Sequence, residues 1–192
     1  MKILTTRQVY WLTQLNILAL CVSLMGGFFM QFAHGEIPCP LCYLQRLAMM
    51  LCAVCLSHVV LSARSGHLKW TSIVQGYGLV IVSAVLGASI SCRQILLHIV
   101  PPDPGFGSPV LGLHLYTWGF VVFALEILSA GLILMTMRPP DTHQTISLTR
   151  IQKGLLAFLA FVIFANMIAV FAAAGWHWNL PSDPTAYLLF QK

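Results

Sequence analysis

Long apolar stretches separated by short polar segments make up most of this chain. Five stretches of 17 to 28 residues contain at most one charged side chain, and they cover residues 8–35, 47–63, 70–92, 116–137 and 154–175. A helix needs about 20 apolar residues to cross the hydrocarbon core of a bilayer. The pattern therefore predicts five membrane-spanning helices, over about 9–33, 43–63, 71–98, 117–137 and 153–175.

Composition supports this interpretation. Hydrophobic residues make up 58% of the 192 residues, charged residues make up 8%, and the mean hydropathy is +0.84. A chain of this composition has too little polar surface for a soluble globule. We therefore expect an all-α membrane protein.

The basic residues predict the orientation of the helices. Seven basic residues lie in three segments that the predicted spans place on the same side of the membrane: Lys2, Arg7, Arg64, Lys69, Arg138, Arg150 and Lys153. Short cytoplasmic loops are enriched in Lys and Arg, so this side is predicted to be cytoplasmic, together with the N-terminus. The segments 34–42 and 99–116 and the chain after 175 then face the opposite compartment. The net charge of +5 is a topology signal, and we expect no nucleic-acid partner.

Aromatic residues flank the predicted spans on the non-cytoplasmic side. Tyr116 and Trp118 follow the Pro- and Gly-rich segment 101–109, and Trp176 and Trp178 follow the fifth span. Such residues suit the membrane interface, so we interpret 101–116 as an anchored connector. The role of the C-terminal tail is not readable from the sequence.

Six cysteines occur, and their predicted depth separates them. Cys21, Cys52 and Cys55 lie deep within predicted spans, where a thiolate is poorly solvated, so they are expected to pack as small apolar residues. Cys92 is predicted near the outer face beside Arg93, where it either packs or serves as a third reactive thiol. No set of four ligands suitable for a structural metal is apparent, so no metal site is expected.

Cys39 and Cys42 differ because they lie where a helix is predicted to begin. In the segment EIPCPLCYLQR, residues 36–46, Pro40 suits the first helical position, which makes Cys39 the predicted N-cap. Cys42 in the first turn faces the positive end of the helix dipole, which favours its thiolate. Two cysteines at this spacing can close a disulfide that is open to exchange. Attack on the Cys39 sulfur then releases Cys42 as the leaving thiolate.

Arg46 lies one helical turn after Cys42. Its guanidinium either extends to the lipid headgroups or stabilises negative charge on an electron acceptor that diffuses in the bilayer. An oxidised quinone fits the second interpretation.

The motif CPLCYLQR in a non-cytoplasmic loop resembles the disulfide bond formation protein B (DsbB) family of bacterial inner-membrane thiol:quinone oxidoreductases. The resemblance spans roughly residues 7–138 and is most specific at 39–46. It implies a four-helix transmembrane bundle, here within residues 1–150, with ubiquinone or menaquinone as the oxidant and a periplasmic thioredoxin-fold dithiol protein as the electron donor. Cys39 and Cys42 match the quinone-coupled pair, and Arg46 matches the quinone-associated arginine.

Two features depart from the family pattern. Members of the family carry a second cysteine pair in the second periplasmic loop, whereas residues 99–118 contain none. Either the donor attacks the Cys39–Cys42 disulfide directly, or Cys92 takes part, or the chain has left the usual pathway. The fifth helix and tail, residues 151–192, also lie outside the four-helix plan.

Three further residues are candidate quinone contacts. Met49 lies one turn beyond Arg46, and His98 lies at the outer end of the third span. Glu126 is predicted about 13 Å into the fourth span, at about 1.5 Å per residue, where a carboxylate is costly unless it is protonated, paired or hydrated.

Two functions are carried forward. The first is a membrane enzyme that oxidises a periplasmic, DsbA-like dithiol partner through Cys39–Cys42 and passes two electrons to quinone. The alternative is a non-catalytic membrane subunit or assembly factor, in which the CPLC disulfide only fixes the start of the second helix.

Overall fold

The computed structural model describes residues 4–65, 68–139, 148–177, 180–182 and 184–190. Lys2 and Trp178, which entered the sequence analysis, lie outside these residues. The described residues form five long α-helices and three short 3-10 turns, η1 (Ala63–Ser65), η2 (Gly175–His177) and η3 (Leu188–Phe190). The α-helices are α1 (Thr6–Ala33), α2 (Pro40–Ser62), α3 (Trp70–Leu97), α4 (Leu115–Thr136) and α5 (Arg150–Ala174).

Local sequence signals account for several helix starts. Thr5 caps α1 in a capping box with Gln8, and Thr149 pairs with Gln152 in the same way at the start of α5. At α2 the Cys39 sulfur accepts a hydrogen bond from the backbone N–H of Cys42, with Pro40 in the first turn. Cys39 is therefore the N-cap residue that the sequence predicts.

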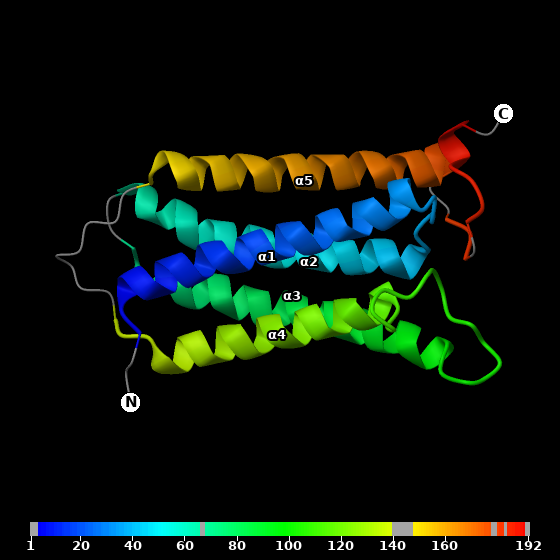
Figure 1. The fold of residues 1–192 in the computed structure, drawn as a ribbon. Coiled ribbons are helices and arrows are strands. Elements are labelled where there is room, and N and C mark those ends of the chain that lie inside the picture. The colour runs from blue at the N-terminus through cyan, green and yellow to red at the C-terminus, as the bar shows by residue number, and fades with distance from the viewer. Residues whose placement is uncertain (1–3, 66–67, 140–147, 178–179, 183, 191–192) are drawn as a thin grey trace.

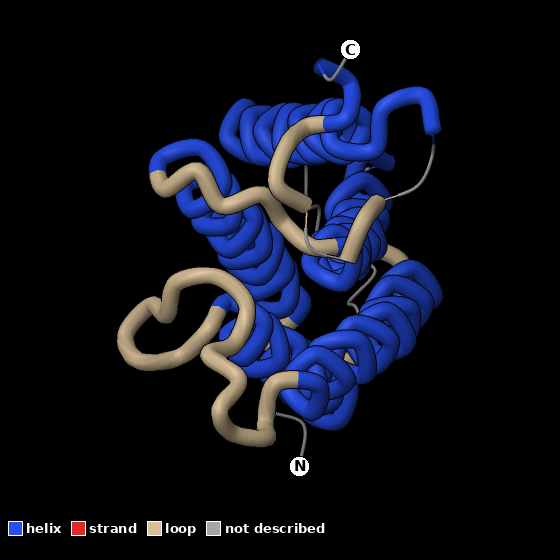
Figure 2. Tube along the Cα trace, turned by 90° about the vertical axis from the view of Figure 1, so that its right-hand side faces the viewer, coloured by secondary structure: helices blue, strands red, loops and turns tan. Residues whose placement is uncertain are grey.

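The helices run along one common axis. α3 packs against both α2 and α4, whereas α5 lies on the other side of the bundle, against α1 and α2 (Figure 1). The view along the bundle shows the same arrangement, with loops gathered at the near end (Figure 2). All five helices are long and apolar enough to cross a membrane. The predicted fold class, an all-α membrane protein with a four-helix bundle and a fifth helix, is confirmed.

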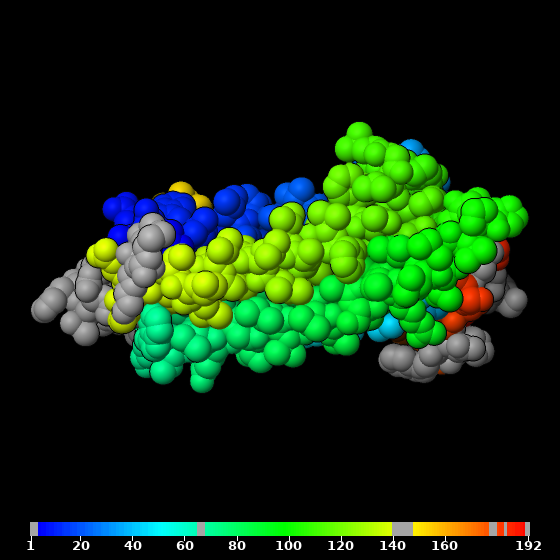
Figure 3. All heavy atoms as spheres, turned by 90° about the horizontal axis from the view of Figure 1, so that it is seen from below, coloured from blue at the N-terminus to red at the C-terminus, as the bar shows by residue number. Residues whose placement is uncertain are grey.

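The surface of the bundle is apolar along much of its length. On α5, for example, Phe161, Phe164 and Met167 are exposed. The α3–α4 face is a smooth helical surface from which the α3–α4 loop projects at one end (Figure 3). An apolar exterior of this kind suits contact with lipid rather than water.

Three segments that are distant in sequence meet at one end of the bundle, which we call the cysteine end. They are residues 34–39, the α3–α4 loop at 98–114, and the C-terminal tail at 180–182 and 184–190 (Figure 1). The loop is tied to the α1–α2 connection because the Glu36 carboxylate accepts a hydrogen bond from the backbone N–H of Ser108 at 2.8 Å. The Trp118 indole N–H, at the start of α4, donates to the Val110 carbonyl of the loop at 2.9 Å. These contacts hold the loop to the bundle, and the anchoring of Tyr116 and Trp118 at the membrane interface stays a prediction.

Small residues allow the helices to approach closely. Gly87 of α3 lies against the fully buried Phe123 ring of α4, and a β-carbon at Gly87 would collide with that ring. Such packing of an aromatic ring on a glycine is a common means of helix association in membranes.

We predict that Gly87→Val lowers the free energy of unfolding by about 1–3 kcal/mol, because the added methyl groups must displace the Phe123 ring. The measurement is thermal or chemical unfolding of the purified protein in detergent. Gly78→Ala is the matched control, because Gly78 lies on the same helix and a β-carbon there meets no atom within 4 Å. Equal stability of Gly87→Val and the wild type would contradict this packing.

Candidate functional site

Cys39 and Cys42 are brought together at the start of α2. Their Sγ atoms lie 2.9 Å apart, and both residues are free thiols in the structure. The arrangement follows from the N-cap position of Cys39, since a cap side chain turns back over the first helical turn.

Two buried amides lie beside the sulfurs: Gln94 of α3 contacts both sulfurs, and Gln45 of α2 contacts Gln94. The Gln94 Nε2 group lies 3.3 Å from the Cys39 sulfur and 3.5 Å from the Cys42 sulfur, and it donates to both. The Gln45 amide in turn donates to the Gln94 Oε1 atom at 2.8 Å, which fixes the orientation of the Gln94 side chain. An N–H donor placed between two sulfurs favours whichever of them carries negative charge.

The hydrogen bonding changes the acidity of Cys39, which precedes the first residue of α2. The thiol of Cys42 donates to the Cys39 sulfur, and together with the backbone N–H groups of Cys42 and Leu41 it lowers the pKa of Cys39 to about 7, against the opposing effect of burial. Gln94 contributes in the same direction. The reduced pair is therefore poised to lose one proton near neutral pH. Its hydrogen bonds favour the negative charge on Cys39, whereas the sequence analysis expected the favoured thiolate on Cys42.

Cys42 borders an apolar cavity of about 410 Å³ between α1, α2 and α4. Arg46 and Met49 line it from α2, and Trp118 and Val122 line it from α4. Cavities of this size and apolar character typically hold small organic ligands.

Arg46 is buried, and it lines this cavity without a carboxylate partner among the described residues. One guanidinium nitrogen donates to the Gln31 Oε1 atom at 2.7 Å, and another donates to the Gly27 carbonyl at 2.8 Å. The group also lies over the rings of Phe28 and Tyr43, at 5.4 and 5.6 Å from their centroids. These four contacts of the guanidinium are all to neutral groups, so it retains the capacity to stabilise a negative charge.

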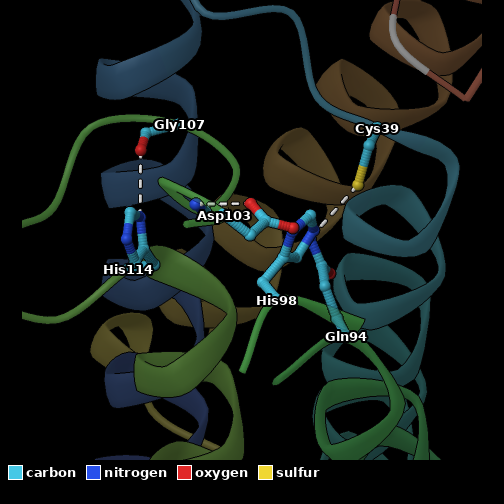
Figure 4. Close-up of polar contacts among 7 residues, drawn as sticks. Cys39, Gln94, His98, Asp103, Gly107 and His114 are labelled. Carbon is cyan, nitrogen blue, oxygen red and sulfur yellow. Dashed lines mark hydrogen bonds and ion pairs between the residues drawn. The ribbon is translucent and has the colours of Figure 1, made fainter. Parts of the chain in front are cut away.

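Cys39 borders a different and larger cavity, of about 920 Å³, at the surface of the cysteine end. Gln94 and His98 line it from the end of α3, and Ser182 and Pro184 line it from the tail. Figure 4 shows the Gln94 amide turned toward the Cys39 sulfur, whereas the His98 ring turns toward Asp103. Glu36 and residues 106–107 border both cavities and form part of the wall between them.

The α3–α4 loop is ordered by its own polar contacts. The His98 Nδ1 atom lies 2.9 Å from an Asp103 oxygen, and the His114 ring bonds to the Gly107 carbonyl (Figure 4). The backbone N–H of Gly105 and the His98 ring hold the pKa of Asp103 below its usual range. The Tyr116 ring stacks on both histidines.

The structure brings together some of the predicted site residues and separates others. Cys42, Arg46 and Met49 line the apolar cavity. His98 lines the larger cavity instead. Glu126 is buried on α4 and lines neither, and one of its carboxyl oxygens has no hydrogen-bond partner among the described residues.

The remaining cysteines lie outside both cavities. Cys92 is exposed on α3 and borders a shallow depression with Arg93. Cys52 is fully buried in the core, where packing is its evident role. Within the described ranges, no group of three or more Cys, His, Asp or Glu side chains is placed to hold a metal ion.

Gln31, Gln45 and Gln94 are site residues that the sequence analysis missed. Each is a polar residue in an apolar span, and each is buried with its amide bonded within the site. A polar amide within a predicted membrane span is itself a signal, because it needs an internal partner. Spacing along the chain does not identify the partner of each amide, because the partners lie on other helices.

Comparison with known proteins agrees with the site. A family model described as "Disulfide bond formation protein DsbB" matches residues 8–108, which include α1, α2, α3 and both cysteines of the pair. The chain belongs to the DsbB family. The predicted resemblance is therefore confirmed, and the matched region ends before α4.

Curated relatives extend the similarity over most of the chain. Disulfide bond formation protein B of Pseudomonas syringae pv. tomato is 33% identical over 166 residues, which cover 70% of this chain and 94% of that relative. Disulfide bond formation protein B 1 of Pseudomonas fluorescens is 32% identical over 158 residues in strain Pf0-1, covering 66% of this chain and 89% of the relative. The protein of the same name in strain Pf-5 is 32% identical over 140 residues, covering 57% and 80%. No solved structure matches the chain.

Membership in the family establishes the general role of the chain. It is a bacterial inner-membrane protein of disulfide bond formation, with an oxidoreductase role in that process. The cysteine pair at the start of α2 is the part of the described structure best suited to that role.

The lowered pKa of Cys39 gives a testable pH dependence. In the reduced protein, we expect the alkylation rate of Cys39 to rise with pH through a midpoint of about 7, because the thiolate is the reactive form and its population falls below the pKa. In Cys42→Ala the midpoint should move upward, toward the ordinary thiol value, since the largest stabilising hydrogen bond is lost. Mass spectrometry of iodoacetamide-treated protein at a series of pH values measures both. An unchanged midpoint in Cys42→Ala would show that Cys42 does not set the acidity of Cys39.

Proposed function

We propose that this protein is a thiol:quinone oxidoreductase that oxidises a periplasmic thioredoxin-fold dithiol protein, such as a DsbA-like protein, and passes two electrons to membrane quinone. One observation carries the proposal. The two sulfurs of a single CPLC pair border two different cavities, Cys39 a large one at the surface and Cys42 an apolar one between the helices. Each sulfur of the pair thus borders a space that can hold a different reactant.

The apolar cavity fits a quinone headgroup. Its lining is mostly hydrocarbon and aromatic, and it contains one buried cation with spare N–H donors, Arg46. A quinone presents carbonyl oxygens that accept hydrogen bonds and gain negative charge on reduction, which a preorganised cation stabilises. Arg46, Cys42 and Met49 are the residues that would hold it. When bound, a quinone supplies a two-electron, two-proton oxidant for the thiol pair, and ubiquinone and menaquinone share this chemistry.

The donor side begins at Cys39. A thiolate of the donor attacks the Cys39 sulfur of the oxidised pair, a bond forms between the two proteins, and the Cys39–Cys42 bond breaks. The Cys42 sulfur leaves with the electron pair. Gln94 can donate to this sulfur as the charge develops, since its Nε2 atom lies within hydrogen-bonding distance of it.

The second donor thiol then completes the exchange. It attacks the mixed disulfide, releases the oxidised donor, and leaves both Cys39 and Cys42 reduced. Oxidation of the pair to the disulfide returns it to its starting state, with two electrons and two protons removed. Arg46 lies one turn from Cys42, and its positive charge faces the cavity where those electrons must go.

This scheme needs no second cysteine pair. Residues 99–118 contain no cysteine, and the α3–α4 loop instead forms part of the wall of the larger cavity. Direct attack on Cys39 is therefore the route that we propose. Cys92 borders a separate depression and is not required for it.

The proposal includes an orientation and a division of the chain. The cysteine end faces the periplasm, and the N-terminus lies in the cytoplasm, as the distribution of Lys and Arg predicts. Residues 1–150 form the catalytic four-helix part, and residues 151–192 add α5 and the tail. His98 and Glu126 remain candidate quinone contacts only if the site rearranges, because neither lines the apolar cavity.

We predict that Cys42→Ser abolishes quinone reduction, because Cys39 then has no partner sulfur with which to form the disulfide that the donor attacks. The assay mixes purified protein, a reduced thioredoxin-fold donor and a short-chain quinone, and follows quinone absorbance. A donor variant that keeps only its attacking cysteine should stay bound to Cys39 of the oxidised wild-type protein as a mixed disulfide, because it has no second thiol to resolve the bond. Non-reducing gels and mass spectrometry identify the trapped cysteine. Cys55→Ser, in the same helix but away from both cavities, is the matched control and should behave as wild type.

Two outcomes would contradict the proposal. Unchanged quinone reduction by Cys42→Ser would exclude the thiol mechanism. A wild-type pair that stays oxidised in quinone-depleted membranes while reduced donor accumulates would favour the structural alternative, in which the Cys39 sulfur serves only as the cap of α2.

We predict that Arg46→Met raises the KM for quinone by about tenfold or more, because a methionine keeps the apolar bulk but removes the charge and its N–H donors. The KM for the donor should stay within about twofold of wild type. Steady-state kinetics at varied quinone concentration measures the first, and varied donor concentration measures the second. Arg64→Met, at the opposite end of α2, is the control. Equal quinone KM values for Arg46→Met and wild type would exclude a role of Arg46 in quinone binding.

A further inference from the structure

Gln31 links the buried arginine to the C-terminal tail. The Gln31 Oε1 atom accepts from Arg46 at 2.7 Å, and its Nε2 group donates to the Tyr187 hydroxyl at 2.9 Å. A second acceptor, the Tyr43 hydroxyl, lies at 3.5 Å, the limit of a hydrogen bond. Tyr187 of the tail is thus connected to Arg46, the proposed quinone-binding cation, through two consecutive hydrogen bonds of Gln31.

The orientation of the Gln31 amide follows from this chain of bonds. A guanidinium can only donate, so the amide must present its oxygen to Arg46. The NH2 group then points away from Arg46 and, being buried, needs an acceptor. The Tyr187 oxygen is the closer of its two acceptors. Without the Tyr187 hydroxyl, the Gln31 NH2 group loses its closer acceptor, and the orientation that places the amide oxygen on Arg46 is less strongly favoured.

The tail is itself held in place. The backbone N–H of Phe190 donates to the Tyr187 carbonyl at 3.1 Å, and the two rings pack edge to face at 6.5 Å. η3 packs on α5 and on η2, and Gly175 allows the close approach of Leu188 and Leu189. α5 packs in turn on α1, the helix that carries Gln31 (Figure 1). The tail therefore reaches Gln31 from a fixed position.

We propose that Tyr187 is a positioning residue for the quinone site, and that the C-terminal tail acts through Gln31 to hold the Arg46 guanidinium toward the apolar cavity. This inference rests on the proposed function. It gives the fifth helix and the tail a role in the reaction, although Tyr187 itself does not line that cavity.

The test is Tyr187→Phe in the full-length protein, because it keeps the ring and removes only the hydroxyl. Loss of one hydrogen bond to a group that orients a charge predicts a rise of about three- to tenfold in both the Kd and the KM for a short-chain quinone. The kcat and the donor KM should stay within about twofold of wild type. The thermal unfolding midpoint should fall by only about 2–4 °C, as the loss of one hydrogen bond predicts. Quenching of tryptophan fluorescence measures the Kd without turnover, since Trp118 lines the cavity.

Tyr10→Phe is the matched control, because it makes the same change on α1, where the Tyr10 hydroxyl has no hydrogen-bond partner among the described residues and the residue does not line the apolar cavity. Its quinone Kd should equal that of wild type. A double-mutant cycle tests the path: in a Gln31→Leu background, which itself weakens quinone binding, Tyr187→Phe should have no further effect.

Different results overturn the two proposals. If wild type reduces quinone but Tyr187→Phe has an unchanged Kd, or has the same effect with and without Gln31, the positioning role is wrong and the proposed function stands. If wild type neither binds nor reduces quinone, both proposals fail.

Discussion

The structure of the cysteine end depends on the burial of one positive charge, the guanidinium of Arg46. A buried cation must have its N–H groups satisfied from within the protein, and here the partners come from α1. Gly27 supplies a carbonyl and, having no side chain, also supplies room, because a β-carbon there would lie 3.1–3.3 Å from the guanidinium. The approach of α1 to α2 is thus set by the same group that gives the cavity its charge.

The two sulfurs border different cavities although they are in contact. Cys39 precedes α2 and borders the surface cavity, whereas Cys42, one turn further, borders the cavity between the helices. The wall between the two cavities includes Glu36, whose bond to Ser108 joins the two connecting segments. A redox pair placed in such a wall can exchange with a protein on one side and with a lipid-soluble molecule on the other, and these reactants need never meet.

Local sequence signals predicted much of this arrangement, and long-range contacts supplied the rest. Apolar runs predicted the five helices, and Pro40 and the cysteine spacing predicted the cap at Cys39, because these depend on neighbours within one turn. The sequence indicated Arg46 because it lies one helical turn from Cys42. It did not indicate Gln94 or Tyr187, because their contacts are distant in sequence: Gln94 lies 52 residues from Cys42, and Tyr187 lies 156 residues from Gln31. Glu126 and His98 were predicted as quinone contacts from their depth in the membrane, but neither lines the apolar cavity. Depth alone does not show which face of a helix a residue lies on.

The position of α5 has a consequence for the order in which the site is assembled. α5 packs on α1 and α2 but not on α3 or α4 within the described residues, so the helices that line the apolar cavity can associate before α5 is present. During synthesis the chain emerges from its N-terminus, and earlier segments pack first. The hydroxyl that completes the hydrogen bonding of Gln31 belongs to a residue near the end of the chain. The Tyr187 hydroxyl, which contacts Gln31 and not Arg46 itself, is therefore synthesised after the direct partners of Arg46 on α1.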